Sequence, residues 1–154
     1  MIFYAIERIP RPKKEIGINL TEGQKTFDTN ICSYVLRRHP QKMLDRFAQL
    51  SYEEVWLSAI VAAELRFGAS KLASPRFSSA VESWLLGFEI RPWPVLASHH
   101  YAQIRCKLEK IGQPIGGMDL MIAAHAQSEK STLITNNARE FHRVSDLSIE
   151  EWQL

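Results

Sequence analysis

The sequence VWLSAIVAAELRFG, residues 55–68, passes from a short apolar run directly into a helical pattern. Residues 55–58 have the length and composition of a buried strand, and the apolar residues within 60–72 recur at helical spacing. The same succession is repeated along the chain with short links. It predicts an α/β fold, in which a parallel β-sheet is flanked by helices on both faces. In such sheets ligands bind beyond the carboxyl ends of the strands, so polar residues at those ends are candidate site residues.

Short strands and helices alternate from residue 25 to the end of the chain. Extended segments are predicted at 25–28, 55–58, 89–94, 132–135 and 147–152. Helices are predicted at 31–38, 41–50, 60–72, 75–86, 98–111, 119–129 and 138–144. Residues 1–24 precede this pattern and include the basic stretch PRPKK. We therefore expect an N-terminal extension over residues 1–24, whose structure the sequence leaves open, and one domain over residues 25–154.

Composition narrows the class of protein. The chain has 154 residues, of which 45% are hydrophobic and 23% charged, as in ordinary globular proteins. Its net charge of +2 permits a polyanionic partner without requiring one. The two cysteines, Cys32 and Cys106, form no disulfide framework and no C-x-x-C motif, so an intracellular protein without structural zinc is expected. No apolar run reaches the ~18 residues of a membrane helix, and a basic signal-peptide leader is missing, so we expect a cytoplasmic protein.

Three carboxylates lie at or near the carboxyl ends of the predicted strands. Asp28 follows the first strand, where an aspartate also commonly caps a helix. Glu64 points with the apolar stripe of its helix, where an unpaired charge is costly unless it reaches water or Arg66. Asp119 follows two glycines at a helix start, which stabilises an ionised carboxylate and would also suit a simple cap. Singly, each residue has a structural explanation.

Together these residues indicate a metal site. The sequence Thr135-Asn136-Asn137 follows a buried strand, with Glu140 shortly after it, although asparagine is also a common turn residue. Several carboxylates gathered in one place repel each other unless a cation neutralises them. Hard oxygen ligands favour Mg²⁺ or Mn²⁺, and such an ion polarises a phosphate and lowers the pKa of bound water. The chemistry implied is hydrolysis of a phosphodiester.

From residue 25 to its end, the chain resembles the PIN-domain ribonuclease toxins of the VapC type. The segments that carry the resemblance are FDTNIC (27–32), SAI (58–60), AELRFGA (63–69), GQPIG (112–116), Asp119 with IAAHA (122–126), and TNNAREF (135–141) with a closing Glu151-Trp152. Each motif is weak alone, but the order and spacing are specific. The subgroup with T-N-N-x-R-E-F resembles the toxins that cut initiator tRNA in its anticodon stem-loop.

The resemblance implies a PIN fold, a Mg²⁺-dependent endoribonuclease in which Mn²⁺ can substitute, a VapB-type antitoxin as partner and often a homodimer. By the motif match, Asp28 and Asp119 would ligate the metal and Glu64 would complete the acidic set as a catalytic residue. Thr29 and Asn136 would hydrogen-bond behind them. Asn137 holds the place where many relatives carry a fourth acid, with Glu140 nearby.

Two departures from the family pattern bear on activity. Residues 24–27 offer only Phe27 to the core, whereas a central parallel strand is expected to be apolar on both faces. We therefore keep an altered upstream segment as a hypothesis, with a less stable or inactive domain as its consequence. The alternative function is a catalytically degenerate PIN domain that binds antitoxin or RNA. The second departure, Gly117-Met118 before Asp119, should affect mainly the local turn.

RNA affinity would come from cations that contact phosphates. The candidates are Arg37, Arg38, Lys42, Arg66, Lys71 and Arg139, with Tyr34, Phe67, Trp93 and His142 as stacking residues. Taken singly, each is better explained as a surface charge or a core aromatic. A phosphatase of the haloacid-dehalogenase type is disfavoured because Asn30 stands where its second aspartate belongs. The motifs of serine hydrolases, P-loop NTPases and dinucleotide enzymes are missing.

Overall fold

The computed structural model describes residues 23–38 and 40–153. Five strands form one sheet in the order β3-β2-β1-β4-β5, and every pair of neighbours is parallel. The strands are β1 (Lys25–Phe27), β2 (Val55–Ser58), β3 (Glu89–Arg91), β4 (Thr132–Thr135) and β5 (Ile149–Glu151). The α/β prediction is confirmed. The expected extension lies almost wholly outside the described residues.

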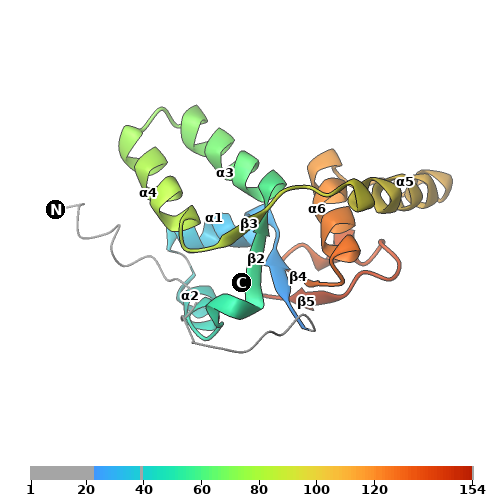
Figure 1. The fold of residues 1–154 in the computed structure, drawn as a ribbon, viewed down its shortest axis with the longest axis horizontal. Coiled ribbons are helices and arrows are strands. Elements are labelled where there is room, and N and C mark those ends of the chain that lie inside the picture. Colours follow the sequence, from blue (N-terminus) through green and yellow to red (C-terminus); the bar gives the residue numbers. More distant parts are fainter. Residues whose placement is uncertain (1–22, 39, 154) are drawn as a thin grey trace.

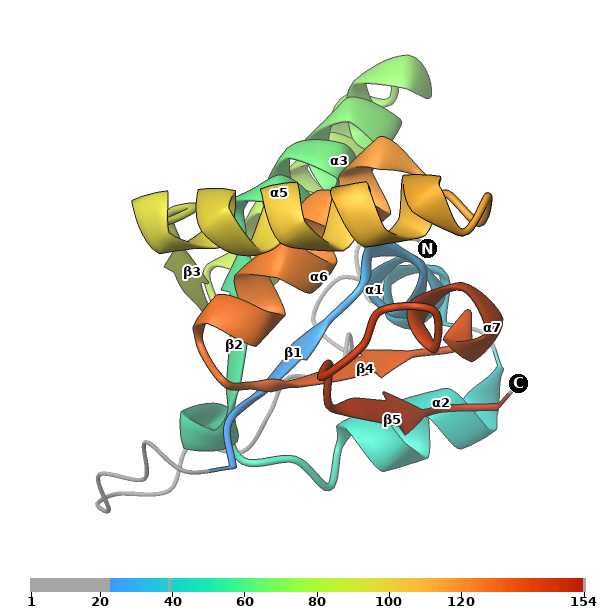
Figure 2. The same ribbon diagram turned by 90° about the vertical axis from the view of Figure 1, so that its right-hand side faces the viewer.

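Helices connect the strands and cover the sheet (Figure 1). The helices are α1 (Thr29–Arg37), α2 (Gln41–Phe47), α3 (Ala59–Lys71), α4 (Pro75–Leu85), α5 (Val95–Lys110), α6 (Gly117–Ser128) and α7 (Ala138–Phe141), with a 3₁₀ turn at Tyr52–Glu54. In Figure 1, α1, α2 and α4 lie on one side of the strands, and α5 and α6 lie on the other. Figure 2 shows α5 running across α6.

Local chemistry moves several helix starts from their predicted positions. α1 begins at Thr29, because Asp28 is its N-cap and accepts a hydrogen bond from the Ile31 N–H. α5 begins at Val95, three residues before the predicted start, directly after the extended N-cap Pro94. α6 begins at Gly117 with Gly116 as its N-cap, so Asp119 lies inside the first turn and does not cap the helix. Its side chain is thereby free to face the sheet edge.

The polar first strand is accommodated by contacts from distant parts of the chain. Phe27 is fully buried, and its ring lies 5.3 Å from that of Phe47 and 5.6 Å from that of Trp152. Lys25 forms a 2.9 Å ion pair with Glu150, which Arg46 also contacts at 3.3 Å. The strand therefore occupies the centre of the sheet with one aromatic anchor and a neutralised lysine. The lower stability of the domain that is expected from this polar strand stays a prediction.

Candidate functional site

Asp28 lies at the carboxyl end of β1 and is only 1% exposed. One carboxylate oxygen accepts a 2.8 Å hydrogen bond from the Ile31 N–H, and the other accepts one from the Thr135 hydroxyl. Burial raises the pKa of Asp28 to about 6, against the lowering effect of these hydrogen bonds and with a further rise from the charge of Asp119. Asp28 therefore caps α1 and also belongs to a group of interacting acids.

Sequence reasoning misses Thr135 as a contact residue, because the pattern identifies it only as the end of a buried strand. Its hydroxyl donates to Asp28 and accepts a 2.8 Å hydrogen bond from the Asn137 N–H. The signal was present, since a threonine two residues before a turn asparagine commonly accepts that N–H. Its contact with Asp28 depends on the pairing of β1 with β4, in which Phe27 lies opposite Ile134.

Glu64 lies on α3 and is half-buried. Its carboxylate accepts a hydrogen bond from the hydroxyl of Thr29, in the first turn of α1. The alternative pairing with Arg66 is wrong: the guanidinium of Arg66 is held by both carboxylate oxygens of Glu82, at 2.7 and 2.9 Å. Thr29 therefore ties the helix that carries Glu64 to the helix that Asp28 caps.

Asp119 is half-buried in the first turn of α6. Burial, with smaller contributions from the charges of Glu140 and Glu64, raises its pKa to about 6. Gly116 allows this placement: a Cβ atom there would lie 3.3 Å from a carboxylate oxygen of Asp119, closer than most such contacts. The predicted close backbone approach is confirmed for Gly116, whereas a Cβ on Gly117 would meet nothing within 4 Å.

The structure thus brings Asp28, Glu64, Asp119 and Glu140 into one electrostatically coupled group. Among the described residues, no three histidine, cysteine, aspartate or glutamate side chains are arranged closely enough to form a complete metal-binding cluster. The donors are carboxylates only, and the pKa values of Asp28 and Asp119 are raised chiefly by burial, with smaller contributions from the neighbouring acids. This chemistry fits a hard divalent cation whose coordination is completed by water.

The residues after β4 divide between backbone and side-chain roles. Asn137 contributes its backbone N–H to Thr135, and Glu140 on α7 is the acid whose charge reaches Asp119. The side-chain oxygen of Asn136 is buried and has no hydrogen-bond partner in the part of the chain that the structure describes. Glu140 is therefore the fourth acid whose charge acts on the group.

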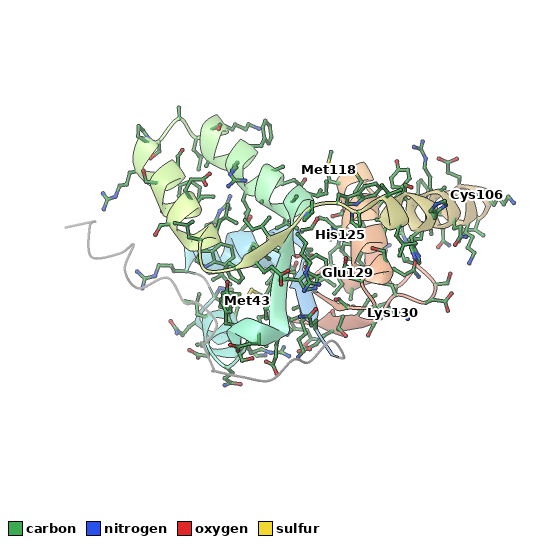
Figure 3. All side chains as sticks on the ribbon, in the orientation of Figure 1. Met43, Cys106, Met118, His125, Glu129 and Lys130 are labelled. Carbon is green, nitrogen blue, oxygen red and sulfur yellow. The ribbon has the colours of Figure 1, made fainter. Side chains whose placement is uncertain are left out.

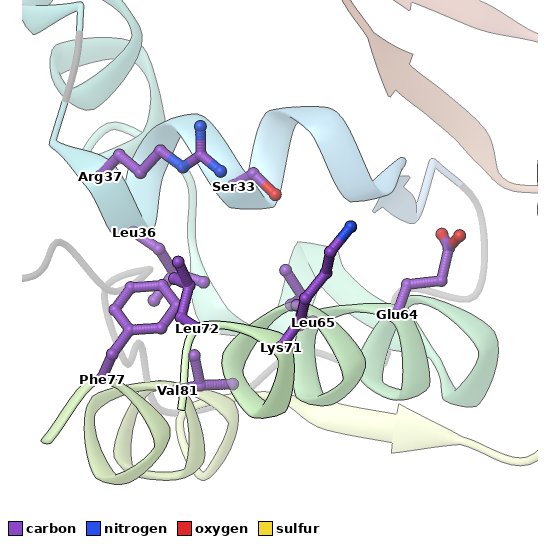
Figure 4. A pocket seen from close by; sticks show the side chains of 10 residues that line it. Ser33, Leu36, Arg37, Glu64, Leu65, Lys71, Leu72, Phe77 and Val81 are labelled. Carbon is purple, nitrogen blue, oxygen red and sulfur yellow. The ribbon is translucent and has the colours of Figure 1, made fainter. Parts of the chain in front are cut away.

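A hollow of about 320 Å³ opens beside Glu64, between α1, α3 and α4. Figure 4 shows Arg37 extending from α1 and Lys71 from α3, with Glu64 at one end and Phe77 among the apolar residues at the other. Within residues 23–38 and 40–153, neither cation forms an ion pair. The hollow therefore places two cations on one approach to Glu64.

The other candidate RNA contacts are scattered. Arg38 forms the C-cap of α1, and Arg139 is exposed on α7. Phe67 is 68% exposed on α3, one turn beyond Glu64. Trp93 instead donates its indole N–H to the Met121 carbonyl at 3.1 Å and packs against the core, which leaves it poorly placed for stacking.

Comparison with known proteins places these features in a family. The PIN domain model matches residues 25–147. The chain is 36% identical over 126 residues to the tRNA(fMet)-specific endonuclease VapC of Shigella flexneri, covering 81% of this chain and 95% of that protein. It is 41% identical over 126 residues to ribonuclease VapC2 of Haemophilus influenzae, with the same coverage.

Solved structures agree with the sequence comparison. The DNA-bound VapBC structure of Salmonella typhimurium matches with a TM-score of 0.78 and 36% identity, over 84% of this chain and 98% of that chain. FitAcB of Neisseria gonorrhoeae matches with a TM-score of 0.74 and 30% identity, over 82% and 96% respectively. The chain therefore belongs to the PIN-domain family and, within it, to the VapC ribonucleases.

Proposed function

We propose that this protein is the ribonuclease toxin of a toxin–antitoxin pair and hydrolyses RNA phosphodiesters at the acidic group, with initiator tRNA as its substrate. The observation that carries the proposal is the convergence of Asp28, Glu64 and Asp119 from three separate segments: the charge of Asp119 raises the pKa of Asp28, and the charge of Glu64 raises the pKa of Asp119. A relative named for tRNA(fMet) cleavage supports the choice of substrate. Mg²⁺ is the proposed cofactor, with Mn²⁺ as a substitute.

Asp28 and Asp119 would hold the ion, and Glu64 would contact it directly or through water. When bound, such an ion would supply Lewis-acid chemistry, polarising a phosphate and lowering the pKa of water. The chain's own hydrogen-bond donors hold two of the acids in place: the Thr135 hydroxyl and the Ile31 N–H orient Asp28, and the Thr29 hydroxyl orients Glu64. These hydrogen bonds fix the orientation of Asp28 and Glu64 before RNA arrives.

The biological setting follows from the relatives. Solved relatives include VapBC complexes, which supports a VapB-type antitoxin as partner. We further propose a homodimer that acts in the cytoplasm. Among the described residues, no helix is both long and apolar enough to cross a bilayer. The family match begins at residue 25, which supports the proposed boundary between the extension and the PIN domain.

The test is cleavage of initiator tRNA by purified, chelator-stripped protein, with and without Mg²⁺ or Mn²⁺. Asp119→Asn serves as the matched variant, because it preserves side-chain size and removes one charge. Discrete metal-dependent fragments that are lost in the variant are the expected result. A folded protein that binds this RNA or its antitoxin without cutting would instead establish the degenerate binding module.

The hollow beside Glu64 predicts where the RNA backbone runs. Replacing both Arg37 and Lys71 by glutamine should raise KM about tenfold and leave kcat nearly unchanged, because both cations contact phosphates outside the reacting group. The salt dependence of binding should also weaken, by about 0.7 in the log–log slope for each lost contact. The matched control replaces Lys107 and Lys110 on the far helix α5. Equal KM values in the two double variants would show that the RNA does not bind along the hollow.

A further inference from the structure

His125 is a buried polar residue that the proposed chemistry does not use. It lies on α6, is 0% exposed, and its ring centroid is 4.6 Å from that of Trp56 on β2. Its Nδ1 atom lies 2.9 Å from the hydroxyl of Ser58. Figure 3 labels His125 farther along α6 than the exposed Met118, which precedes Asp119. The ring therefore faces the sheet, on the same helix that carries an acid of the site.

Ser58 has a structural role of its own. It is the last residue of β2 and the N-cap of α3, and its hydroxyl accepts a 3.1 Å hydrogen bond from the Ile60 N–H. Because α3 carries Glu64 and α6 carries Asp119, the contact between Ser58 and His125 joins the two acidic helices. On each helix, fewer than two turns separate the contact from the acid.

A histidine at this position destabilises the folded state, so its presence needs an explanation. Its Nε2 atom is buried and finds no partner among residues 23–38 and 40–153. An apolar ring of similar size would avoid that cost and keep the contact with Trp56. Burial, with a smaller contribution from the charge of Arg91, lowers the pKa of His125 to about 4, so the ring is neutral near pH 7. What the imidazole adds over an apolar ring is the bond to Ser58.

We propose that His125 is a positioning residue for RNA cleavage: through Ser58 it sets the start of α3, and hence Glu64, relative to Asp119. This inference rests on the proposed ribonuclease function. It assigns His125 no contact with the RNA or the metal. A small displacement of one acid is enough to slow the chemical step, because catalysis at such a site depends on the relative placement of its charged groups.

Three variants test the inference. His125→Phe keeps the ring and removes the hydrogen bond, whereas His125→Asn keeps a polar atom close to the position of Nδ1. Ser58→Ala removes the bond from the other side. We expect His125→Phe and Ser58→Ala each to lower kcat about ten- to a hundredfold with KM nearly unchanged. His125→Asn should recover most of kcat, and the double variant should lose no more than the single ones. Thermal unfolding of each variant establishes that the fold is retained.

The outcomes separate this inference from the proposed function. Wild-type kcat in a folded His125→Phe variant overturns it, and so does an equal loss in His125→Phe and His125→Asn, which would indicate packing alone. If His125→Phe does not fold, wild-type kcat in Ser58→Ala overturns the inference. Mn²⁺ affinity, measured by calorimetry, gives a readout without RNA, and it should fall in the same two variants. If the parent protein binds Mn²⁺ but cleaves no RNA, the proposed function fails. The Mn²⁺ affinities still test the role of His125 in that case. Equal affinities in the parent, His125→Phe and Ser58→Ala would overturn the inference.

Discussion

Asp28→Asn is expected to reduce metal-dependent cleavage by about 10³-fold while making the metal-free fold more stable at pH 7.5. Activity falls because a charged oxygen that would hold the ion is lost. Stability rises because Asp28, with its pKa raised to about 6 by burial, is ionised at pH 7.5 at a cost to the folded state. Compared with a pKa near 3.8 in the unfolded chain, that cost is about 3 kcal/mol.

The substitution should preserve the local structure. Asparagine is as good an N-cap as aspartate, so its oxygen can still accept from the Ile31 N–H. The hydroxyl of Thr135 can accept from the new amide group. The free energy of unfolding is measured with urea in the presence of chelator, and cleavage is measured with excess Mg²⁺. Asp45→Asn on the exposed face of α2 is the matched control. A less stable Asp28→Asn protein, or one that cleaves like the parent, would contradict the assignment.

The sequence was most informative where local pattern determines structure. The change from apolar run to helical spacing at residues 55–72 predicts β2 and α3, and both are confirmed within one residue. Asp28 was placed correctly because a strand end and a helix cap coincide there. The parallel order of the strands then brings Asp119 near enough for its charge to raise the pKa of Asp28. Alternation and strand ends were therefore enough to predict the location of the acidic group.

The rest depends on contacts between residues far apart in the chain. The weak first strand holds its place because Lys25 meets Glu150, and no local rule predicts that pair. Arg66 pairs with Glu82 because α3 packs against α4, whereas Glu64, two residues before it on α3, does not face it. The Ser58 partner of His125 is likewise set by tertiary packing. Such choices depend on which helix faces which, and sequence spacing does not contain that information.

Divalent metal is expected to stabilise the protein at pH 7.5 and to lose most of this effect at pH 5. The pKa values of Asp28 and Asp119 are both raised to about 6, chiefly by burial. In the metal-free protein their contribution to stability is complete below about pH 3.8 and is lost as the pH rises through 6. A metal ion binds the ionised form, so it must compete with protons below pH 6. At 100 times its Kd it should add about 2.7 kcal/mol, or roughly 5–10 °C in Tm.

The effect of His125 on the pH dependence of stability is opposite to that of the two acids, so the experiment must separate them. Its pKa is lowered to about 4 by burial and by Arg91, so its contribution to stability is lost as the pH falls from 6.5 toward 4. The pH profile of the parent alone therefore mixes two trends. The difference between the parent and Asp28→Asn/Asp119→Asn isolates the acids, because His125 is common to both proteins. Tm is measured with chelator and with Mg²⁺ or Mn²⁺ from pH 5 to 7.5. An equal rise in Tm at both ends of that range, or in the double variant, would show that the metal binds elsewhere.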